Sequence, residues 1–147
     1  MEKIKIRRAK KEDFEKLAEL MQGFWDKIDT HRKEYKSGFL KELKDNKTAR
    51  FLLFDNKELI GNITMVKYWT TWCNGYQMVL EEIVVAPKHR KKGYGLKLLD
   101  YAIEYAKKNA KEIWLGTGTR SKAQTLYKKR MKKANAVVYE LKFHDKR

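Results

Sequence analysis

The sequence predicts a single α/β domain in which a mixed central β-sheet carries helices on both faces. Residues 76–117 give a strand, a turn with two glycines, an amphipathic helix and a short strand, a unit that makes its two strands parallel. Residues 49–69 give two strands joined by a short turn, which makes an antiparallel pair. The length of 147 residues and the hydrophobic fraction of 42% suit one domain, residues 1–147, with a sizeable core.

The elements before the second strand follow from the spacing of apolar residues. Residues 3–8 alternate, with Ile4 and Ile6 on one face, and predict the first strand. Residues 14–23 have apolar side chains at helical spacing, and Asp13 is placed to cap that helix. Residues 35–43 predict a second short helix. Strands are then expected over residues 49–54, 59–69 and 76–86.

The later elements follow in the same way. Apolar positions at helical spacing predict a helix over residues 93–109, which Asn109 ends. Residues 113–115 predict a short strand. A last helix is expected from Ser121 to about Lys133, and the alternating apolar residues of 137–143 predict a final strand.

Composition limits the function classes. The net charge of +16 permits nucleic acid, an acidic membrane or a phosphorylated cofactor as a partner. The lysines are spread along the chain without a nucleic-acid motif, so we expect a local cofactor patch, no nucleic-acid partner and no membrane partner. Cys73 is the single cysteine, and a cytoplasmic location fits a chain without disulfides. Both a monomer and a homodimer stay open.

The turn that opens the helix at residue 93 has the character of an anion site. The first backbone N–H groups of a helix have no partner within it, and the helix dipole makes that end positive. Gly93 and Gly95 let a ligand approach the backbone, and Arg90, Lys91 and Lys92 add positive charge. The pattern favours a phosphate or pyrophosphate. The alternative is a tight turn with a solvated basic surface.

Two motifs give a family resemblance. Residues 90–95, Arg-Lys-Lys-Gly-Tyr-Gly, fit the pattern Arg/Gln-x-x-Gly-x-Gly/Ala, and residues 123–127, Ala-Gln-Thr-Leu-Tyr, fit a later Ala-x-x-Leu-Tyr pattern. With both motifs in this order of elements, the chain resembles the GNAT superfamily of N-acetyltransferases. Residues 71–75 and 80–83 are similar to a pattern of the diamine (spermidine/spermine) acetyltransferases, with one extra residue before Gly75 and Glu82 in place of an aspartate. The chain departs from the family at Arg120, where asparagine is common, and after Tyr127, where a Gly-Phe pair is common.

The resemblance implies a GNAT-like fold, with parallel strands that splay apart at the cofactor site, and acetyl-CoA as the acyl donor. The backbone of Ile83, Val84 and Val85 would pair with the pantetheine arm. The pyrophosphate would lie on the motif residues, which are Arg90, Lys91, Lys92, Gly93, Tyr94 and Gly95. Arg120 and Ala123 are the further cofactor-binding residues that the later motif implies.

Acetyl transfer to an amine needs a base and an acid. An amine with a lysine-like pKa of about 10.4 is mostly protonated at neutral pH, so a base must take a proton from it. By resemblance Glu81 is the water-mediated base and Tyr127 the acid that protonates the leaving thiolate, while Val85 N–H stabilises the oxyanion. As neighbours on a strand, Glu81 and Glu82 are expected to point to opposite faces, with Glu81 on the face of Ile83 and Val85. Glu82 would bind the acceptor amine or form a salt bridge.

The acceptor is less defined. Three acidic residues and four aromatic residues fall in regions that could hold a cationic amine by charge and by cation–π contact, and these are Asp26, Asp29, Glu34, Phe24, Trp25, Tyr35 and Trp72. The three histidines have no ligand spacing, so we expect no metal. The sequence predicts an N-acetyltransferase for a primary amine, a small polyamine-like or amino-acid-like molecule. A protein lysine or N-terminal acetyltransferase, or a non-catalytic acyl-CoA-sensing or nucleic-acid-binding module, is the alternative.

Overall fold

The computed structural model describes residues 3–25 and 27–144. The chain forms two compact units, residues 1–115 and residues 116–147. The strands of the first unit are β1 (Ile4–Arg8), β2 (Thr48–Asp55), β3 (Glu58–Thr70), β4 (Gly75–Val85) and β5 (Glu112–Trp114). Its helices are α1 (Phe14–Gln22), α2 (Lys33–Lys44) and α3 (Tyr94–Asn109), with short 3-10 turns η1 (Lys11–Asp13) and η2 (Pro87–His89). The second unit contains α4 (Gln124–Tyr127).

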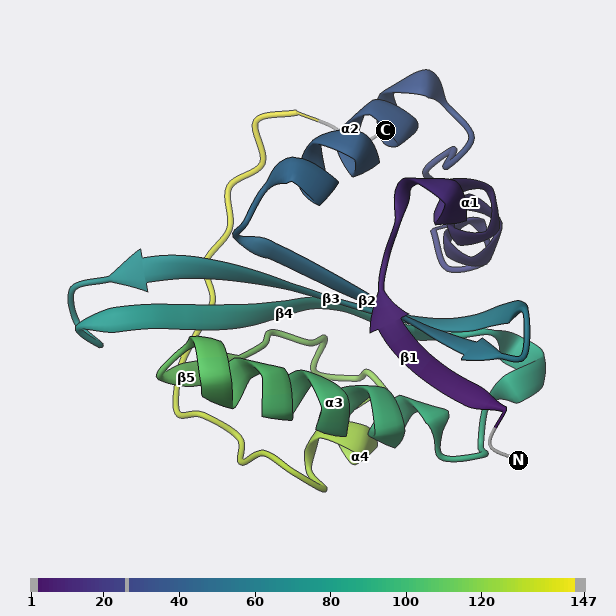
Figure 1. Cartoon of the computed structure of the whole chain (residues 1–147). Helices are drawn as coiled ribbons and strands as arrows, with labels where there is room; N and C mark the ends of the chain where they lie inside the picture. Colours follow the sequence, from purple (N-terminus) through teal and green to yellow (C-terminus); the bar gives the residue numbers. More distant parts are fainter. Residues whose placement is uncertain (1–2, 26, 145–147) are drawn as a thin grey trace. The chain divides into compact units, whose positions relative to one another are not determined.

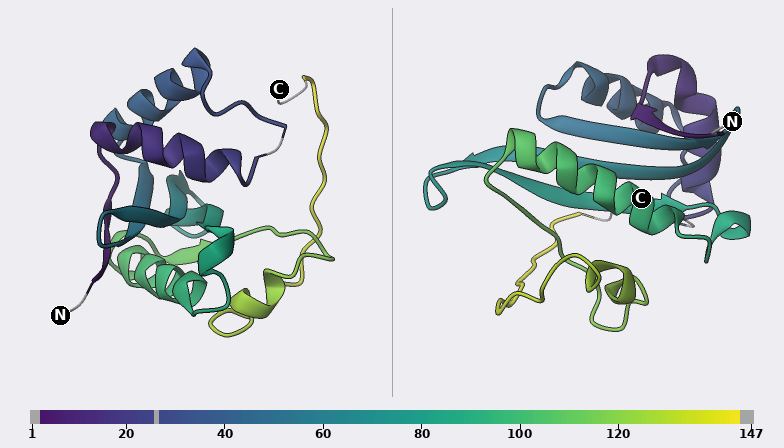
Figure 2. Two further views of the ribbon diagram at one scale, coloured as in Figure 1. Left: turned by 90° about the vertical axis from the view of Figure 1, so that its right-hand side faces the viewer. Right: turned by 60° about the horizontal axis from the view of Figure 1, so that its bottom comes forward.

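The five strands form one mixed sheet in the order β1-β2-β3-β4-β5. The first four strands pair antiparallel, and β5 pairs parallel with β4 after the crossover through α3. Helices α1 and α2 lie on one face of this sheet and α3 lies on the other (Figures 1 and 2). The predicted mixed sheet with helices on both faces is therefore confirmed.

Each face of the sheet is buried by an apolar helix stripe. Helix α1 turns Phe14, Leu17 and Met21 inward, at the spacing of one helical face, and they pack in a cluster with Leu52 of β2. On the other face, α3 buries a stripe that consists of Leu98, Leu99, Ala102 and Ala106. Val84 of β4 belongs to the first cluster, so this packing holds the strand that carries both predicted glutamates.

Asp13 is buried at the start of α1 but does not cap that helix through its side chain. Its carboxylate instead accepts two hydrogen bonds from the guanidinium of Arg7, at 2.7 and 2.8 Å, and one from the backbone N–H of Lys10 at 2.8 Å. The hydrogen bonds from Arg7 hold the pKa of Asp13 below its ordinary value, against the effect of burial.

The second unit contradicts two predictions. The last helix is shorter than expected: α4 ends at Tyr127, and only a turn continues to Met131. The run of like charges after Tyr127 disfavours further helix. The final strand over residues 137–143 is wrong, because these residues form no strand. Their apolar side chains are 78–91% exposed at the positions Val137, Val138, Tyr139, Leu141 and Phe143.

Within residues 3–25 and 27–144, no helix combines the length and the apolar character that crossing a lipid bilayer requires.

Candidate functional site

Strand β4 contains one residue more than the stretch of β3 that faces it. Thr64 of β3 lies opposite Glu82, whereas the next residue, Met65, lies opposite Leu80. Glu81 therefore has no partner across the ladder and forms a β-bulge. A bulge interrupts the strict alternation of side chains between the two faces of a sheet.

The bulge changes where the two glutamates lie. Glu81 and Glu82 line the same pocket, together with residues of α2, so the prediction that they point to opposite faces is wrong. Val85 lies opposite Gly61 of β3, so the two residues share a face of the sheet. A Cβ built on Gly61 would meet Leu98 of α3 at 3.0 Å. The face that Val85 shares is thus the α3 face, and Glu81 lies on the other one.

The pocket shared by the two glutamates has a volume of about 420 Å³. Its walls come from α2 and from strands β2, β3 and β4, all within the first unit. Four carboxylates line it, from Glu42, Asp45, Glu81 and Glu82, beside two cations, Arg50 and Lys41. The structure brings the two predicted glutamates together here and leaves Glu81 exposed.

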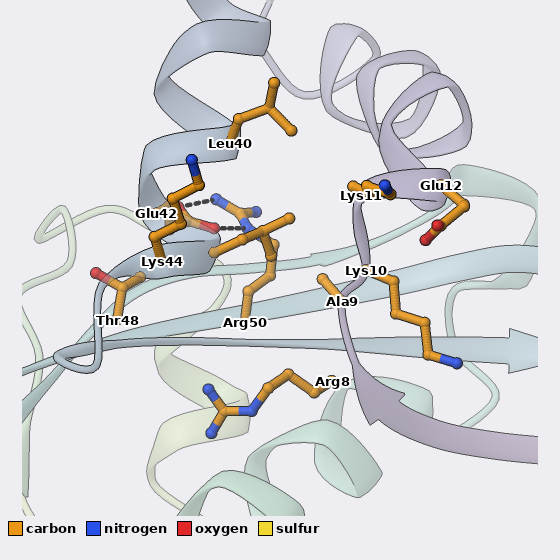
Figure 3. A pocket seen from close by; sticks show the side chains of 11 residues that line it. Arg8, Ala9, Lys10, Lys11, Glu12, Leu40, Glu42, Lys44, Thr48 and Arg50 are labelled. Carbon is orange, nitrogen blue, oxygen red and sulfur yellow. Dashed lines mark hydrogen bonds and ion pairs between the residues drawn. The ribbon is translucent and has the colours of Figure 1, made fainter.

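Arg50 joins two partly buried carboxylates of this pocket, those of Glu42 and Glu82. Its guanidinium donates two hydrogen bonds to Glu42, at 2.7 and 2.9 Å, and lies 3.2 Å from Glu82. Figure 3 shows Glu42 reaching from α2 to Arg50 on β2. A further hydrogen bond of 3.0 Å goes to the side chain of Asn62. Burial alone would lower the pKa of Arg50, but the hydrogen bonds to Glu42 and the charge of Glu82 raise it above its ordinary value.

Glu82 has three partners in this network. Besides Arg50, its carboxylate accepts hydrogen bonds from the hydroxyl of Thr64 at 3.0 Å and from the indole of Trp25 at 3.2 Å. Tyr35 lies close enough that burial, together with the charge of Glu82, raises the pKa of its phenol to about 12. Two of the aromatic residues predicted beside the acceptor therefore lie near Glu82.

The other residues predicted near the acceptor are not gathered at the pocket. Asp29 accepts a hydrogen bond from the backbone of His31, and Glu34 lies 3.6 Å from Arg32, so both belong to local surface contacts. Phe24 and Trp72 are exposed, and Trp72 lies in the turn between β3 and β4. Asp26 lies outside the described residues.

The donor side of the candidate site begins where β4 loses its partner. Strand β5 pairs only with the stretch from Gln77 to Val79. Within residues 3–25 and 27–115, no strand pairs with that side of Leu80–Val85. This stretch includes Ile83, Val84 and Val85. Apart from the carbonyl of Val85, which accepts a hydrogen bond from Arg90, its backbone groups on that edge have no strand partner and can pair with an extended ligand.

The turn between β4 and α3 exposes backbone groups at its end. Lys91 and Gly93 both have positive φ, of 63° and 86°, and Gly93 is the residue before α3. The backbone N–H of Lys97 bonds to the carbonyl of Gly93, so the three amides before it, those of Tyr94, Gly95 and Leu96, have no acceptor inside the helix. These amides form the start of a 16-residue helix.

In the turn before α3, the side chain of Arg90 makes a structural hydrogen bond, whereas those of Lys91 and Lys92 face solvent. Arg90 donates a hydrogen bond of 2.9 Å from Nε to the carbonyl of Val85, so its side chain ties the turn to the end of β4. Lys91 and Lys92 are exposed beside the free amides. Tyr94 packs its ring 6.3 Å from that of His89. Amides, cations and an open strand edge together fit a ligand that carries a pyrophosphate and an extended polar arm.

The remaining predicted residues belong to the second unit. Arg120 is exposed, and Ala123 is the residue before α4. Tyr127 ends α4 and is half-buried, and burial raises the pKa of its phenol. A phenol with a raised pKa keeps its proton at neutral pH.

Reasoning from the sequence missed Arg50 and Glu42. A charged residue within an apolar strand is the signal for Arg50, since the strand reads Ala49, Arg50, Phe51, Leu52. A buried cation needs buried anions. Glu42 carries no such signal, because it looks like an ordinary surface residue of a helix.

A second pocket of about 630 Å³ lies beside the same ion pair (Figure 3). Arg50 and Glu42 line both pockets, but the second one adds basic residues from the chain around β1 and from the end of α2. These residues are Arg8, Lys10, Lys11 and Lys44. This lining disfavours a cationic ligand.

Two proteins with similar sequences are named as acetyltransferases. The chain is 44% identical to streptothricin acetyltransferase A of Bacillus subtilis over 61 residues, which cover 42% of this chain and 32% of that protein. It is 28% identical to an uncharacterized N-acetyltransferase of Archaeoglobus fulgidus over 132 residues, 84% of this chain and 89% of that one. The match to the Bacillus protein thus spans about a third of its length.

A solved structure has the same fold. A GNAT family acetyltransferase of Staphylococcus aureus is 25% identical and superposes with a TM-score of 0.77, covering 95% of this chain and 100% of that chain. The family model described as "Acetyltransferase (GNAT) family" matches residues 14–131, which is most of the chain. The protein therefore belongs to the GNAT family of acetyltransferases, whose enzymes take acetyl-CoA as the acyl donor.

Proposed function

We propose that this protein transfers the acetyl group of acetyl-CoA to a small cationic amine, which binds in the pocket between α2 and β4. The observation that carries the proposal is the bulge at Glu81. It places an exposed carboxylate in a pocket on one face of β4, within the stretch of that strand that has no partner beyond β5. An amine in this pocket and an extended donor along the edge of β4 would then lie next to the same stretch of one strand.

The donor half of the proposal rests on the turn and on the open edge of β4. The amides of Tyr94 and Gly95, with the side chains of Lys91 and Lys92, would hold the pyrophosphate, and the backbone of Ile83–Val85 would hold the pantetheine arm. Acetyl-CoA supplies the acetyl group as a thioester when it is bound. In this proposal the N–H of Val85 stabilises the charge that develops on the carbonyl oxygen of the acetyl group.

Glu81 is the base in this mechanism. Glu82 already neutralises Arg50 and accepts hydrogen bonds from Thr64 and Trp25, so a proton added to it would weaken three contacts. No hydrogen bond or ion pair engages Glu81 within the described part of the chain. Glu81 accepts the proton that the ammonium of the acceptor must lose, directly or through water. Glu82 and Arg50 hold the wall of the pocket.

Tyr127 is the acid, which gives its proton to the thiolate of CoA. This assignment rests on the Ala-x-x-Leu-Tyr motif. Burial raises the pKa of the phenol, so Tyr127 carries at neutral pH the proton that this role needs. Arg120 and Ala123 would contact the donor from the same motif. The ammonium loses two protons on becoming an amide. One goes to Glu81, which returns it to solvent, and the second replaces the proton that Tyr127 gives to the thiolate.

The charge of the pocket favours an amine as the acceptor. Four carboxylates face two cations there, in a protein of net charge +16. Such a local excess of negative charge attracts an ammonium that the surrounding field would repel. The name of the Bacillus relative supports a small-molecule acceptor, and a polyamine-like or amino-acid-like amine fits the volume of the pocket.

The test measures release of CoA thiol from acetyl-CoA with a panel of amines that contains diamines, polyamines, amino acids and a lysine peptide. We expect turnover with small amines, and a loss of about 10²-fold or more in kcat for Glu81→Gln because general-base catalysis contributes about that much. Glu104→Gln is the matched control, since Glu104 is an exposed residue of α3 that pairs with Lys107.

Three outcomes would contradict parts of the proposal. Turnover with the lysine peptide and with no small amine would refute the small-molecule acceptor. Binding of acetyl-CoA without turnover on any amine would refute the enzymatic function. An unchanged kcat in Glu81→Gln, with a lowered kcat in Glu82→Gln, would move the base to Glu82.

A further inference from the structure

A row of apolar side chains crosses three strands beside the acidic pocket. Val66 of β3 lies opposite Val79 of β4, and Val79 lies opposite Trp114 of β5. Residues directly opposite each other on neighbouring strands have their side chains on the same face of the sheet. Val66 lines the pocket together with Gly38 and Lys41 of α2, so the whole row lies on the face of Glu81 and Glu82.

Trp114 is the outermost side chain of this row. It ends β5, the edge strand of the sheet, and its side chain is 42% exposed. No ring contact or hydrogen bond of its side chain is present among residues 3–25 and 27–144. Together with Val66 and Val79 it forms an apolar strip beside the cleft, and exposed apolar patches of this kind are common in ligand-binding grooves.

Trp114 lies near the proposed base. Glu81 follows Val79 by two residues, and strands lie about 4.8 Å apart with a rise of about 3.3 Å per residue, so the backbones of Trp114 and Glu81 are about 8 Å apart. That span corresponds to a short hydrocarbon chain or one ring. An ammonium at Glu81 would leave the body of the same molecule above Val79 and the indole of Trp114.

We infer that the acceptor is an amine with an apolar arm, a short alkyl chain or a ring next to the ammonium, and that Trp114 determines specificity by packing against that arm. This inference rests on the proposed function and names the substrate class of the same pocket. The arm gains contact with the row Val66, Val79 and Trp114. An amine without the arm binds through its charge alone.

The kinetic test compares two amines of equal charge, ethylamine and hexylamine, in the wild-type protein and in Trp114→Ala. We expect the KM for hexylamine to rise about 10-fold in the variant, since contacts of about one methylene in an apolar site change discrimination by that factor or more. The KM for acetyl-CoA and the KM for ethylamine should change less than 2-fold. Trp114→Phe should restore most of the loss, because it keeps an aromatic face.

Trp69→Ala is the matched control. Trp69 is also exposed, at 57%, but it lies on the opposite face of the sheet. It is three residues after Val66 on β3, and side chains alternate between faces along a strand, so Trp69 is on the α3 side. Its removal should leave both KM values unchanged. An equal rise in KM for both amines in Trp114→Ala, or a rise in Trp69→Ala as large, would overturn the inference.

A binding measurement separates the inference from the proposed function. In the protein labelled with ¹⁵N-tryptophan, the indole signal that disappears in Trp114→Phe is that of Trp114. Hexylamine should shift this signal and leave that of Trp69 unchanged. A shift without any acetylation would refute the proposed function and keep only the part of the inference that an amine binds with its apolar arm at Trp114. Acetylation of both amines without a shift would keep the proposed function and overturn the inference.

Discussion

Replacing Arg50 by methionine tests whether the ion network around its buried guanidinium holds α2 against the sheet. The side chain of Arg50 is 10% exposed, and its guanidinium contacts Glu42, Glu82 and Asn62 at 2.7–3.2 Å. Arg50→Met keeps most of the volume but leaves two partly buried carboxylates without a cation. Loss of one partner from a buried charge pair costs about 3–5 kcal/mol, so we expect a decrease of that size in the free energy of unfolding.

The assay is urea unfolding at pH 7, with the m value compared between variants. Lys41→Met is the matched control, because Lys41 is an exposed residue of α2 that lines the same pocket, and it should change stability by about 0.5 kcal/mol or less. Adding Glu42→Gln and Glu82→Gln to Arg50→Met removes the uncompensated charges and should recover most of the loss. A loss below about 1 kcal/mol in Arg50→Met alone would refute the reasoning that the charges are buried.

Three further predictions concern single residues. Gly93→Ala should lower the free energy of unfolding by about 1–2 kcal/mol, because the φ of Gly93 is positive. Gly93→Asn should lower it less, because asparagine tolerates that conformation. Both variants should weaken acetyl-CoA binding, and an unchanged Kd in both would remove Gly93 from the donor site. Asp13→Asn should cost about 1–2 kcal/mol at pH 7. Since the folded pKa of Asp13 is lowered, its contribution is present above the unfolded pKa of about 3.9 and is lost as the pH falls through the folded pKa. The Tm values of variant and wild type should therefore converge as the pH is lowered, and a constant difference would show that the charge of Asp13 is not the cause. Tyr127→Phe should lower kcat about 10²-fold and leave the Kd for acetyl-CoA unchanged, and an unchanged kcat would remove Tyr127 from the mechanism.

The regular elements could be predicted because their patterns are local. Residues 93–109 were expected to be helical and α3 spans Tyr94–Asn109, since its apolar stripe repeats at helical spacing over four turns. The parallel pairing of β4 with β5 followed from the crossover alone. In both cases the residues that define the element lie within one short stretch of sequence.

The features that could not be predicted depend on residues far apart in the sequence. The bulge at Glu81 exists only in relation to the register of β3, which the residues around Glu81 do not encode. The alternation of residues 137–143 indicates what a strand would bury, but a strand also needs a neighbour to pair with, and these residues form none. The partners of Arg50 come from α2 and β4, so its network becomes visible only in the folded chain.

The bulge in β4 has a consequence for how such a site can arise. A bulge is one inserted residue, and it also bends the strand that carries it and increases its twist. Here the last pairing of β4 with β5 is at Val79, two residues before Glu81. One inserted codon therefore adds a second carboxylate to that of Glu82 on the α2 side, just beyond the last pairing with β5. Deleting Glu81 would restore an uninterrupted ladder and remove the exposed carboxylate of the pocket, while Glu82 would stay beside Arg50.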